Sequence, residues 1–278
     1  MSNTSTDINE HKCNIDDRNL ALSQIVDSSK YELTLPSFQA NCKRELDQEG
    51  VLVLPGFLTE QAVSNVVAEA KAHEHLAYYT ASDHNVYLMP TDAQLPLDHP
   101  RNRLVSSSKG CITDDQIPED SVLRELYNSD AVRHFLCRVL GEEKLHEYAD
   151  PLSSINLHYA SHGQELGWHF DNSSFAITLL IQKTDAGGVF EYVKDVRDAD
   201  AGEANYTDTN RILNSEMQTS KLSMEPGTLV LFRGRNSLHR VTPTIGDTTR
   251  LLVVLAYNTE PGIALSESAR KTFYGRLC

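Results

Sequence analysis

A short segment of the sequence, GWHFDN at residues 167–172, contains a histidine and an aspartate two positions apart. If this segment is a β-strand, the side chains of His169 and Asp171 project from the same face. A single metal ion could then take a nitrogen from the histidine and an oxygen from the aspartate. The pair alone is a weak signal, because a histidine and an aspartate at this spacing also occur on solvated surface strands.

Two later residues strengthen the metal hypothesis. His239 lies in the segment SLHRVTP, between the strand-like runs GTLVLF and RLLVVLA. Two histidines and one carboxylate on one face of an octahedral ion leave three adjacent positions open, which is typical of non-haem Fe(II) oxygenases. Arg250 begins the strand-like run that follows His239. A guanidinium binds a carboxylate through two hydrogen bonds, so Arg250 could hold the far carboxylate of a 2-oxo acid that chelates the iron.

The composition narrows the class of protein. The 278 residues include 39 acidic and 25 basic side chains, for a formal net charge of −14. Affinity for DNA or RNA comes mainly from lysine and arginine, so we expect no nucleic-acid partner. The five cysteines are widely spaced and form no CxxC pair, which favours a reducing, cytoplasmic location over a disulfide framework. The apolar runs are too short to cross a bilayer, so we expect no membrane partner.

The order of the sequence patterns predicts how these residues are positioned. Residues 1–18 are polar and predict a flexible tail, whereas residues 19–278 predict a single domain. Helical patterns dominate residues 19–148, although 78–118 has little periodicity and predicts an irregular segment. From residue 149 onward, short β-rich runs alternate with turn residues, which is typical of an antiparallel sandwich or barrel. We therefore expect a mainly β fold with N-terminal helices packed against it.

Taken together, the motifs resemble the Fe(II)/2-oxoglutarate-dependent dioxygenase superfamily. The resemblance rests on His169-Phe-Asp171, on His239 in its HRVTP context and on Arg250 after GDTT, and it covers residues 149–260. It implies a double-stranded β-helix (jelly-roll, cupin-like) core. It also implies that the two histidines and Asp171 bind Fe(II) and that Arg250 binds the distal carboxylate of 2-oxoglutarate. O2 would be the other co-substrate, with succinate and CO2 as co-products.

The implied core spans residues 149–262, and a C-terminal segment follows at 263–278. More narrowly, WHFDNSSFAITLLIQ followed by AGGVFEYV is similar to the free-amino-acid hydroxylases related to radical halogenases. In halogenating relatives a small residue replaces the carboxylate and leaves a place for chloride. Because Asp171 occupies that position here, the resemblance implies hydroxylation, desaturation or oxidative cyclisation. The expected substrate is a small polar molecule, an amino acid or a derivative, from whose unactivated carbon a hydrogen is abstracted.

Five further residues are candidates for the co-substrate and substrate sites. Asn156 and His158 share one face of a predicted strand. The resemblance places hydrogen bonds to 2-oxoglutarate inside the barrel, and Asn156 is our candidate there, whereas His158 is a candidate for substrate contact or a structural barrel residue. Arg101 and Arg103 could clamp a substrate carboxylate, or belong to a solvated basic loop. Asn172 follows the ligand pair and could meet the substrate or serve only the turn.

A long polar and acidic segment, residues 194–220, separates two strand-like runs. It suits a lid over a small polar substrate, and a solvated hairpin loop would have the same composition. Two other functions stay open: a prolyl-hydroxylase-like enzyme acting on peptides, and a non-catalytic sensor that binds metal or 2-oxoglutarate on the same fold. A sensor is expected to have lost a ligand or the arginine, and all four residues are present. The sequence does not indicate an oligomeric state.

Overall fold

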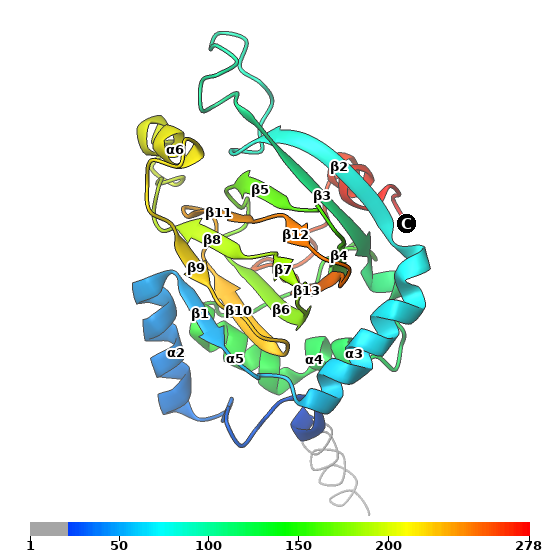
Figure 1. Ribbon diagram of the computed structural model, residues 1–278. Helices are drawn as coiled ribbons and strands as arrows, with labels where there is room; N and C mark the ends of the chain where they lie inside the picture. Colours follow the sequence, from blue (N-terminus) through cyan, green and yellow to red (C-terminus); the bar gives the residue numbers. More distant parts are fainter. Residues whose placement is uncertain (1–21) are drawn as a thin grey trace, which may run out of the picture.

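The computed structural model describes residues 22–278, so the flexible tail predicted for residues 1–18 lies outside the described residues. One antiparallel sheet of 11 strands curls around the centre of the molecule (Figure 1). Its strands are β1 (Val51–Leu54), β2 (Tyr78–Asn85), β3 (Leu104–Ile112), β4 (Ile155–Ala160), β5 (Leu166–His169), β6 (Ala176–Gln182), β8 (Phe190–Val193), β9 (Ser220–Leu222), β10 (Thr228–Phe232), β11 (Leu238–Val241) and β13 (Arg250–Leu255).

The curled sheet has two walls that are joined by β3. The strand order is β1-β10-β6-β13-β4-β3-β5-β11-β8-β9, and β2 pairs with β3 outside this path. β3 pairs with β4 through Gly110 and Tyr159 and with β5 through Ser107 and Leu166. A separate two-stranded sheet joins β7 (Ala186–Gly187) to β12 (Thr244–Ile245). This double-walled antiparallel arrangement is the jelly-roll core that the sequence predicts, and the fold class is confirmed.

Four helices cover the outer face of the wall that contains β6 and β13 (Figure 1). The first of them ends at Gly50, whose φ of 71° is left-handed and whose N–H donates to Leu46 O. The second begins at Thr59, whose hydroxyl accepts a hydrogen bond from Ala62 N. The helices are α2 (Pro36–Glu49), α3 (Glu60–His73), α4 (Val122–Asn128) and α5 (Asp130–Leu140).

Strand alternation separates the hydrophobic core from the interior of the barrel. In β13, Leu251, Val253 and Leu255 are at most 2 % exposed and pack in the core beneath the helices. Successive side chains in a strand point to opposite faces, so Arg250 projects into the barrel interior instead. The same alternation in β4 places Leu157 and Tyr159 in the core and His158 in the interior. The wall formed by β1, β10, β6, β13 and β4, the major wall, therefore packs its apolar face outward and turns its polar face toward the barrel interior.

The prediction of an irregular segment at residues 78–118 is wrong for much of its length. Eight residues of β2 pair with β3, from Tyr78 opposite Cys111 to Asn85 opposite Leu104, and a loop at 86–103 joins the two strands. Most of β2 is exposed and polar, with Thr, Ser, Asp and Asn along it. It therefore lacks the apolar alternation by which a half-buried strand is usually predicted. The N-terminal part thus supplies strands as well as helices.

Two further helices pack elsewhere on the molecule. α6 (Tyr206–Leu213) lies in the segment predicted as a lid, next to the loop that joins β2 to β3 (Figure 1). α7 (Glu267–Tyr274) packs on β2 and β3, and buried Tyr274 clusters there with Cys111 and Leu152. Within residues 22–278, no helix is long and apolar enough to span a membrane.

Candidate metal centre

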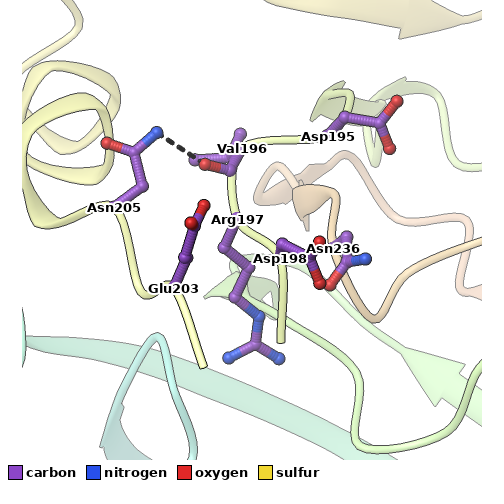
Figure 2. Close-up of a pocket in the computed structure, with 7 residues that line it drawn as sticks. All are labelled: Asp195, Val196, Arg197, Asp198, Glu203, Asn205 and Asn236. Atoms are coloured by element: carbon purple, nitrogen blue, oxygen red, sulfur yellow. Dashed lines mark hydrogen bonds between the residues drawn. The ribbon is translucent and has the colours of Figure 1, made fainter. Parts of the chain in front are cut away.

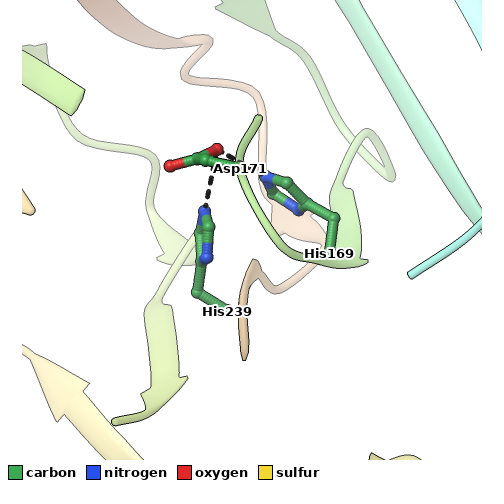
Figure 3. A group of neighbouring side chains, drawn as sticks. All are labelled: His169, Asp171 and His239. Carbon is green, nitrogen blue, oxygen red and sulfur yellow. Dashed lines mark ion pairs between the residues drawn. The ribbon is translucent and has the colours of Figure 1, made fainter. Parts of the chain in front are cut away.

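Three side chains from two adjoining strand ends form the candidate metal centre (Figure 3). His169 ends β5 and is directly opposite His239 of β11. Each imidazole Nε2 lies 3.6 Å from the same oxygen, Asp171 Oδ1. One candidate ligand atom from each of the three residues lies within 4.8 Å of the others. The structure therefore brings together the three residues that the motifs predict.

The backbone fixes both imidazoles with the same nitrogen facing inward. His169 Nδ1 lies 2.8 Å from Gly167 O, and His239 Nδ1 lies 3.0 Å from Ser237 O. A carbonyl oxygen only accepts, so each Nδ1 carries a hydrogen and each Nε2 is the nitrogen that faces the centre. Burial, and then the neighbouring His239, lowers the pKa of His169 to about 3. His169 is therefore neutral at physiological pH, the state in which imidazole binds a metal.

Asp171 completes the donor set with a carboxylate that lacks a protein partner on one side. Burial acts to raise its pKa, but His239 and His169 outweigh burial and hold the pKa below the usual value. Asp171 Oδ2 is buried and has no hydrogen-bond partner. A Cβ added at Gly234 would lie 1.8 Å from this oxygen, so the glycine provides the room for it. A buried, ionised and unpartnered oxygen beside the Nε2 atoms of two imidazoles fits a divalent ion, and the donor set suits Fe(II).

Arg250 lies on the major wall and faces the same barrel interior. It is 6 % exposed, and burial lowers its pKa to about 10. Among residues 22–278, no acidic side chain is within salt-bridge distance of its guanidinium. A Cβ added at Gly188 would lie 3.0 Å from Arg250 Cδ, so a second glycine makes room at this end. A buried cation without an acidic partner is typical of a site for an anion.

Asn156 and His158, the other two predicted barrel residues, differ in which of their polar atoms already have hydrogen-bond partners. Asn156 Nδ2 donates to Leu152 O and Ile155 O, each at 2.8 Å, and its Oδ1 accepts from Tyr274 Oη. Both amide hydrogens are taken, so the predicted contact of Asn156 with the co-substrate would have to use a remaining lone pair. His158 instead faces Lys109, with 2.8 Å between the lysine Nζ and the histidine Nε2. The roles predicted for Asn156 and His158 stay predictions.

Of the two arginines in the β2–β3 loop, Arg103 is engaged in hydrogen bonds and Arg101 has a donor without a partner. Arg103 donates to Asn214 Oδ1 at 2.6 Å and to Leu213 O at 3.0 Å, which fastens the loop to the end of α6. Arg101 has a buried Nη1 without a hydrogen-bond partner. Asn172 is exposed, and its backbone carbonyl accepts from Arg235 Nη1. Of the three, Arg101 has a buried, unpaired donor, which suits a substrate carboxylate.

The segment predicted as a lid contains a polar cavity of about 630 Å³ (Figure 2). None of its seven lining residues is one of the three candidate ligands, so the cavity is a neighbour of the metal centre and not the centre itself. Arg197 connects the two: its Nη2 lies 3.5 Å from Asp171 O, and its guanidinium lies 4.1 Å from the Phe170 ring. The lining residues are Asp195, Val196, Arg197, Asp198, Glu203, Asn205 and Asn236.

The sequence patterns did not predict three residues of the site. Lys109 and Arg197 are cations without an acidic partner within the described residues, and Gly234 provides the space for Asp171. Lys109 stands alone in the polar run VSSSKGC, so only the pairing of its strand reveals its position. Arg197 lies in a charged segment that also looks like a solvated loop. The run FRGRN around Gly234 carries no recognisable pattern.

Comparison with known families places the chain. The family model described as Halogenase D matches residues 36–272. The chain belongs to the Halogenase D family. The superfamily predicted from the motifs, the Fe(II)/2-oxoglutarate oxygenases, is thereby confirmed. A search of curated protein sequences finds no significant match.

Solved structures share the fold of this Halogenase D family member at low sequence identity. The 2-oxoglutarate-dependent epimerase SnoN from nogalamycin biosynthesis aligns with a TM-score of 0.57 and 13% identity, over 80% of this chain and 84% of its own. The carbocyclase SnoK, also from nogalamycin biosynthesis, aligns with a TM-score of 0.56 and 12% identity, over 83% of this chain and 89% of its own. A 2OG-Fe(II) oxygenase from Burkholderia pseudomallei aligns with a TM-score of 0.51 and 13% identity, over 81% of this chain and 92% of its own. At such identities the similarity is evidence for the fold alone.

Proposed function

We propose that this Halogenase D family member is an Fe(II)/2-oxoglutarate-dependent oxygenase that oxidises an unactivated carbon of a small polar substrate without halogenating it. An amino acid or a derivative is the expected substrate, and hydroxylation, desaturation or oxidative cyclisation is the expected outcome. One observation carries the proposal: the third ligand position is the carboxylate of Asp171, with a buried oxygen that has no protein partner. A site for chloride would require that position to be vacant.

The side chains divide the work in this proposal. His169, Asp171 and His239 would hold the iron, and Arg250 would bind the distal carboxylate of 2-oxoglutarate. With O2, the bound iron and 2-oxoglutarate supply the oxidising chemistry that breaks the substrate C–H bond and releases succinate and CO2. The hydrogen bonds from Nδ1 of each histidine keep both rings oriented when the ion enters.

The β2–β3 loop and the lid segment at 194–220 each carry an arginine that could bind a carboxylate of the substrate. Arg101 has a buried unpaired donor, and Arg197 reaches the backbone of Asp171 from the lid. A substrate carboxylate held between such groups would place its carbon chain beside the metal centre. Arg103, by joining the loop to α6, holds these two parts together. The energy of this binding would position the target carbon, since reactivity depends on sub-ångström placement.

The test has two stages. Under anaerobic conditions, Fe(II) and 2-oxoglutarate should together give a weak visible charge-transfer band, and neither should give it alone. In air, a panel of free amino acids and of proline-containing peptides should then be scored by succinate release and by product mass. Absence of both the band and succinate would rule out the oxygenase, whereas the band without succinate would favour a non-catalytic sensor.

The same panel distinguishes the finer alternatives. A chlorinated product from the unaltered enzyme in the presence of chloride would contradict our reading of Asp171. Turnover restricted to peptides would replace the amino-acid substrate with a prolyl-hydroxylase-like activity. The Asp171→Gly variant is the matched control, because it opens the ligand position to chloride while the two histidines stay in place.

A further inference from the structure

A second cation lies beside Arg250 and has no part in the function proposed so far. The Lys109 Nζ is 2.8 Å from the Nε2 of His158. Among residues 22–278, no acidic side chain is within salt-bridge distance of this ammonium. Desolvation lowers the pKa of Lys109, and burial together with Lys109 and Arg250 holds the pKa of His158 well below its usual value. His158 is therefore neutral and can accept a hydrogen bond from the lysine.

Strand register places Lys109 and Arg250 on the same face of the sheet. Arg250 of β13 is directly opposite Ala160 of β4. On the other side of β4, Gly110 is opposite Tyr159, and the next step of this antiparallel register brings Lys109 opposite Ala160. Directly opposed residues of antiparallel strands point to the same face. Lys109, Ala160 and Arg250 thus form a row across three neighbouring strands.

The small residue in the middle of this row leaves space between two cations. Neighbouring strands are about 4.8 Å apart, so the two cationic backbones are separated by roughly 10 Å. Lysine and arginine side chains are long enough to approach one another over the methyl group of Ala160. His158, two residues before Ala160 on the same face, is close enough to feel both charges. A carboxylate in this gap would offer one oxygen to each cation.

We propose that Lys109 is the second cation of the site that binds the distal carboxylate of the 2-oxo acid co-substrate, and that His158 holds its ammonium in place. The inference rests on the proposed function and deepens it. Two cations that are partly desolvated and lack acidic partners are unfavourable until an anion enters between them. The cations near the metal centre and the lid, Arg101 and Arg197, are separate groups, which we assign to the primary substrate. The row would make the enzyme selective for dicarboxylic over monocarboxylic 2-oxo acids.

The Lys109→Met variant tests this role, because it removes the charge and keeps a side chain of similar length. Dissociation constants are measured anaerobically with Fe(II), from the visible absorbance, for 2-oxoglutarate and for 2-oxopentanoate, which lacks the distal carboxylate. Loss of one charge-assisted hydrogen bond should weaken binding of 2-oxoglutarate by about 10- to 100-fold. Binding of 2-oxopentanoate should change less than about twofold, since that acid never meets Lys109.

Control variants separate charge from packing. Lys109→Arg keeps a cation and should restore most of the affinity for 2-oxoglutarate. His158→Leu removes the acceptor and should weaken 2-oxoglutarate binding less than Lys109→Met does, whereas His158→Gln keeps an acceptor and should bind almost normally. Lys183→Met removes an exposed lysine that pairs with Glu225, and it should leave both constants unchanged.

A calorimetric titration of the metal-free protein with glutarate keeps this inference separable from the proposed function. Glutarate carries the distal carboxylate but needs no iron, so its binding should weaken in Lys109→Met even if no charge-transfer band forms. Equal losses for 2-oxoglutarate and 2-oxopentanoate would show that Lys109 acts on the fold or the metal centre and would overturn the proposal. Unchanged affinity for 2-oxoglutarate and glutarate would overturn it as well.

Discussion

The two ends of the barrel interior carry opposite charges. At the metal centre, Asp171 stays ionised between two imidazoles, and its buried oxygen lacks a partner. In the row on the major wall, Lys109 and Arg250 flank Ala160, and among residues 22–278 neither cation has an acidic side chain within salt-bridge distance. One end is thus built for a cation and the other for an anion. A 2-oxo acid that chelates an ion at the first end with its oxo group and places its far carboxylate at the second would match both.

The two ends also differ in how the chain assembles them. Two of the three candidate metal ligands are two residues apart, and a single strand pair, His239 opposite His169, adds the third. The row needs β3, β4 and β13, whose contributing residues are far apart in sequence. A local motif can therefore reveal the first end, whereas the second emerges only from the register of three strands. Variants at each end should consequently have separable effects on metal and on anion binding.

The largest expected effect is at the metal end. Asp171→Ala removes the one carboxylate among the three candidate ligands, so iron-dependent succinate formation should fall by about 1000-fold or more. Iron content after dialysis and succinate release measure the loss. The row should be untouched, so the metal-free variant should bind glutarate as the parent does. Succinate formation equal to that of the parent would show that the ligand assignment is wrong.

The next effect in size is at the opposite end. Arg250→Met removes a buried guanidinium, and binding of 2-oxoglutarate should weaken by about 100-fold, as expected for loss of a bidentate charged pair. Iron content should remain that of the parent, because Arg250 does not contact the metal ligands. Arg250→Lys should fall in between, since an ammonium keeps the charge and loses the fork geometry. A loss of iron in Arg250→Met would mean that the two ends are not independent.

These differences explain what the sequence could and could not predict. The β-rich runs predicted an antiparallel β core, and the resemblance of the motifs to a known superfamily predicted its jelly-roll form, the three candidate metal ligands and Arg250. The pairing of β2 with β3 did not, because exposed polar residues along β2 give no apolar alternation. Lys109 did not either, since its neighbour His158 is set by a strand register that no local pattern encodes.

Asn156 shows that a correctly predicted strand position does not reveal which atoms of a side chain are free to bind a ligand. Its strand was predicted from alternation and its place inside the barrel from the resemblance, but its amide oxygen accepts a hydrogen bond from Tyr274, which belongs to the C-terminal helix α7. A contact across 118 positions depends on where that helix packs, and the local sequence of either partner does not contain this information. Residue type and alternation therefore predict which face a side chain takes, whereas tertiary packing decides which of its atoms remain free.

A smaller effect should follow from removing the space around Asp171. In Gly234→Ala the new Cβ would lie 1.8 Å from Asp171 Oδ2, so the carboxylate must move. Displacing one ligand should weaken iron binding by about 10- to 100-fold, comparable to the loss of a group that orients a ligand. Competition with a chelator measures the iron affinity, and glutarate binding to the metal-free protein should not change. Full iron affinity would show that Asp171 is not held where the structure places it.

The smallest effect is expected from the corresponding glycine at the anion end. In Gly188→Ala the new Cβ would lie 3.0 Å from Arg250 Cδ, and the φ of 58° is unfavourable for alanine. Because the arginine side chain can shift slightly, 2-oxoglutarate binding should weaken only about three- to tenfold, with iron affinity unchanged. Gly163→Ala is the matched control: its φ of 79° imposes similar backbone strain, yet no atom lies within 4 Å of the added Cβ. Both variants should therefore lose about 1 kcal/mol of stability in thermal unfolding, and only Gly188→Ala should lose co-substrate affinity. Equal affinity in the two variants would show that contact with Arg250 contributes nothing and that backbone strain alone accounts for the effects.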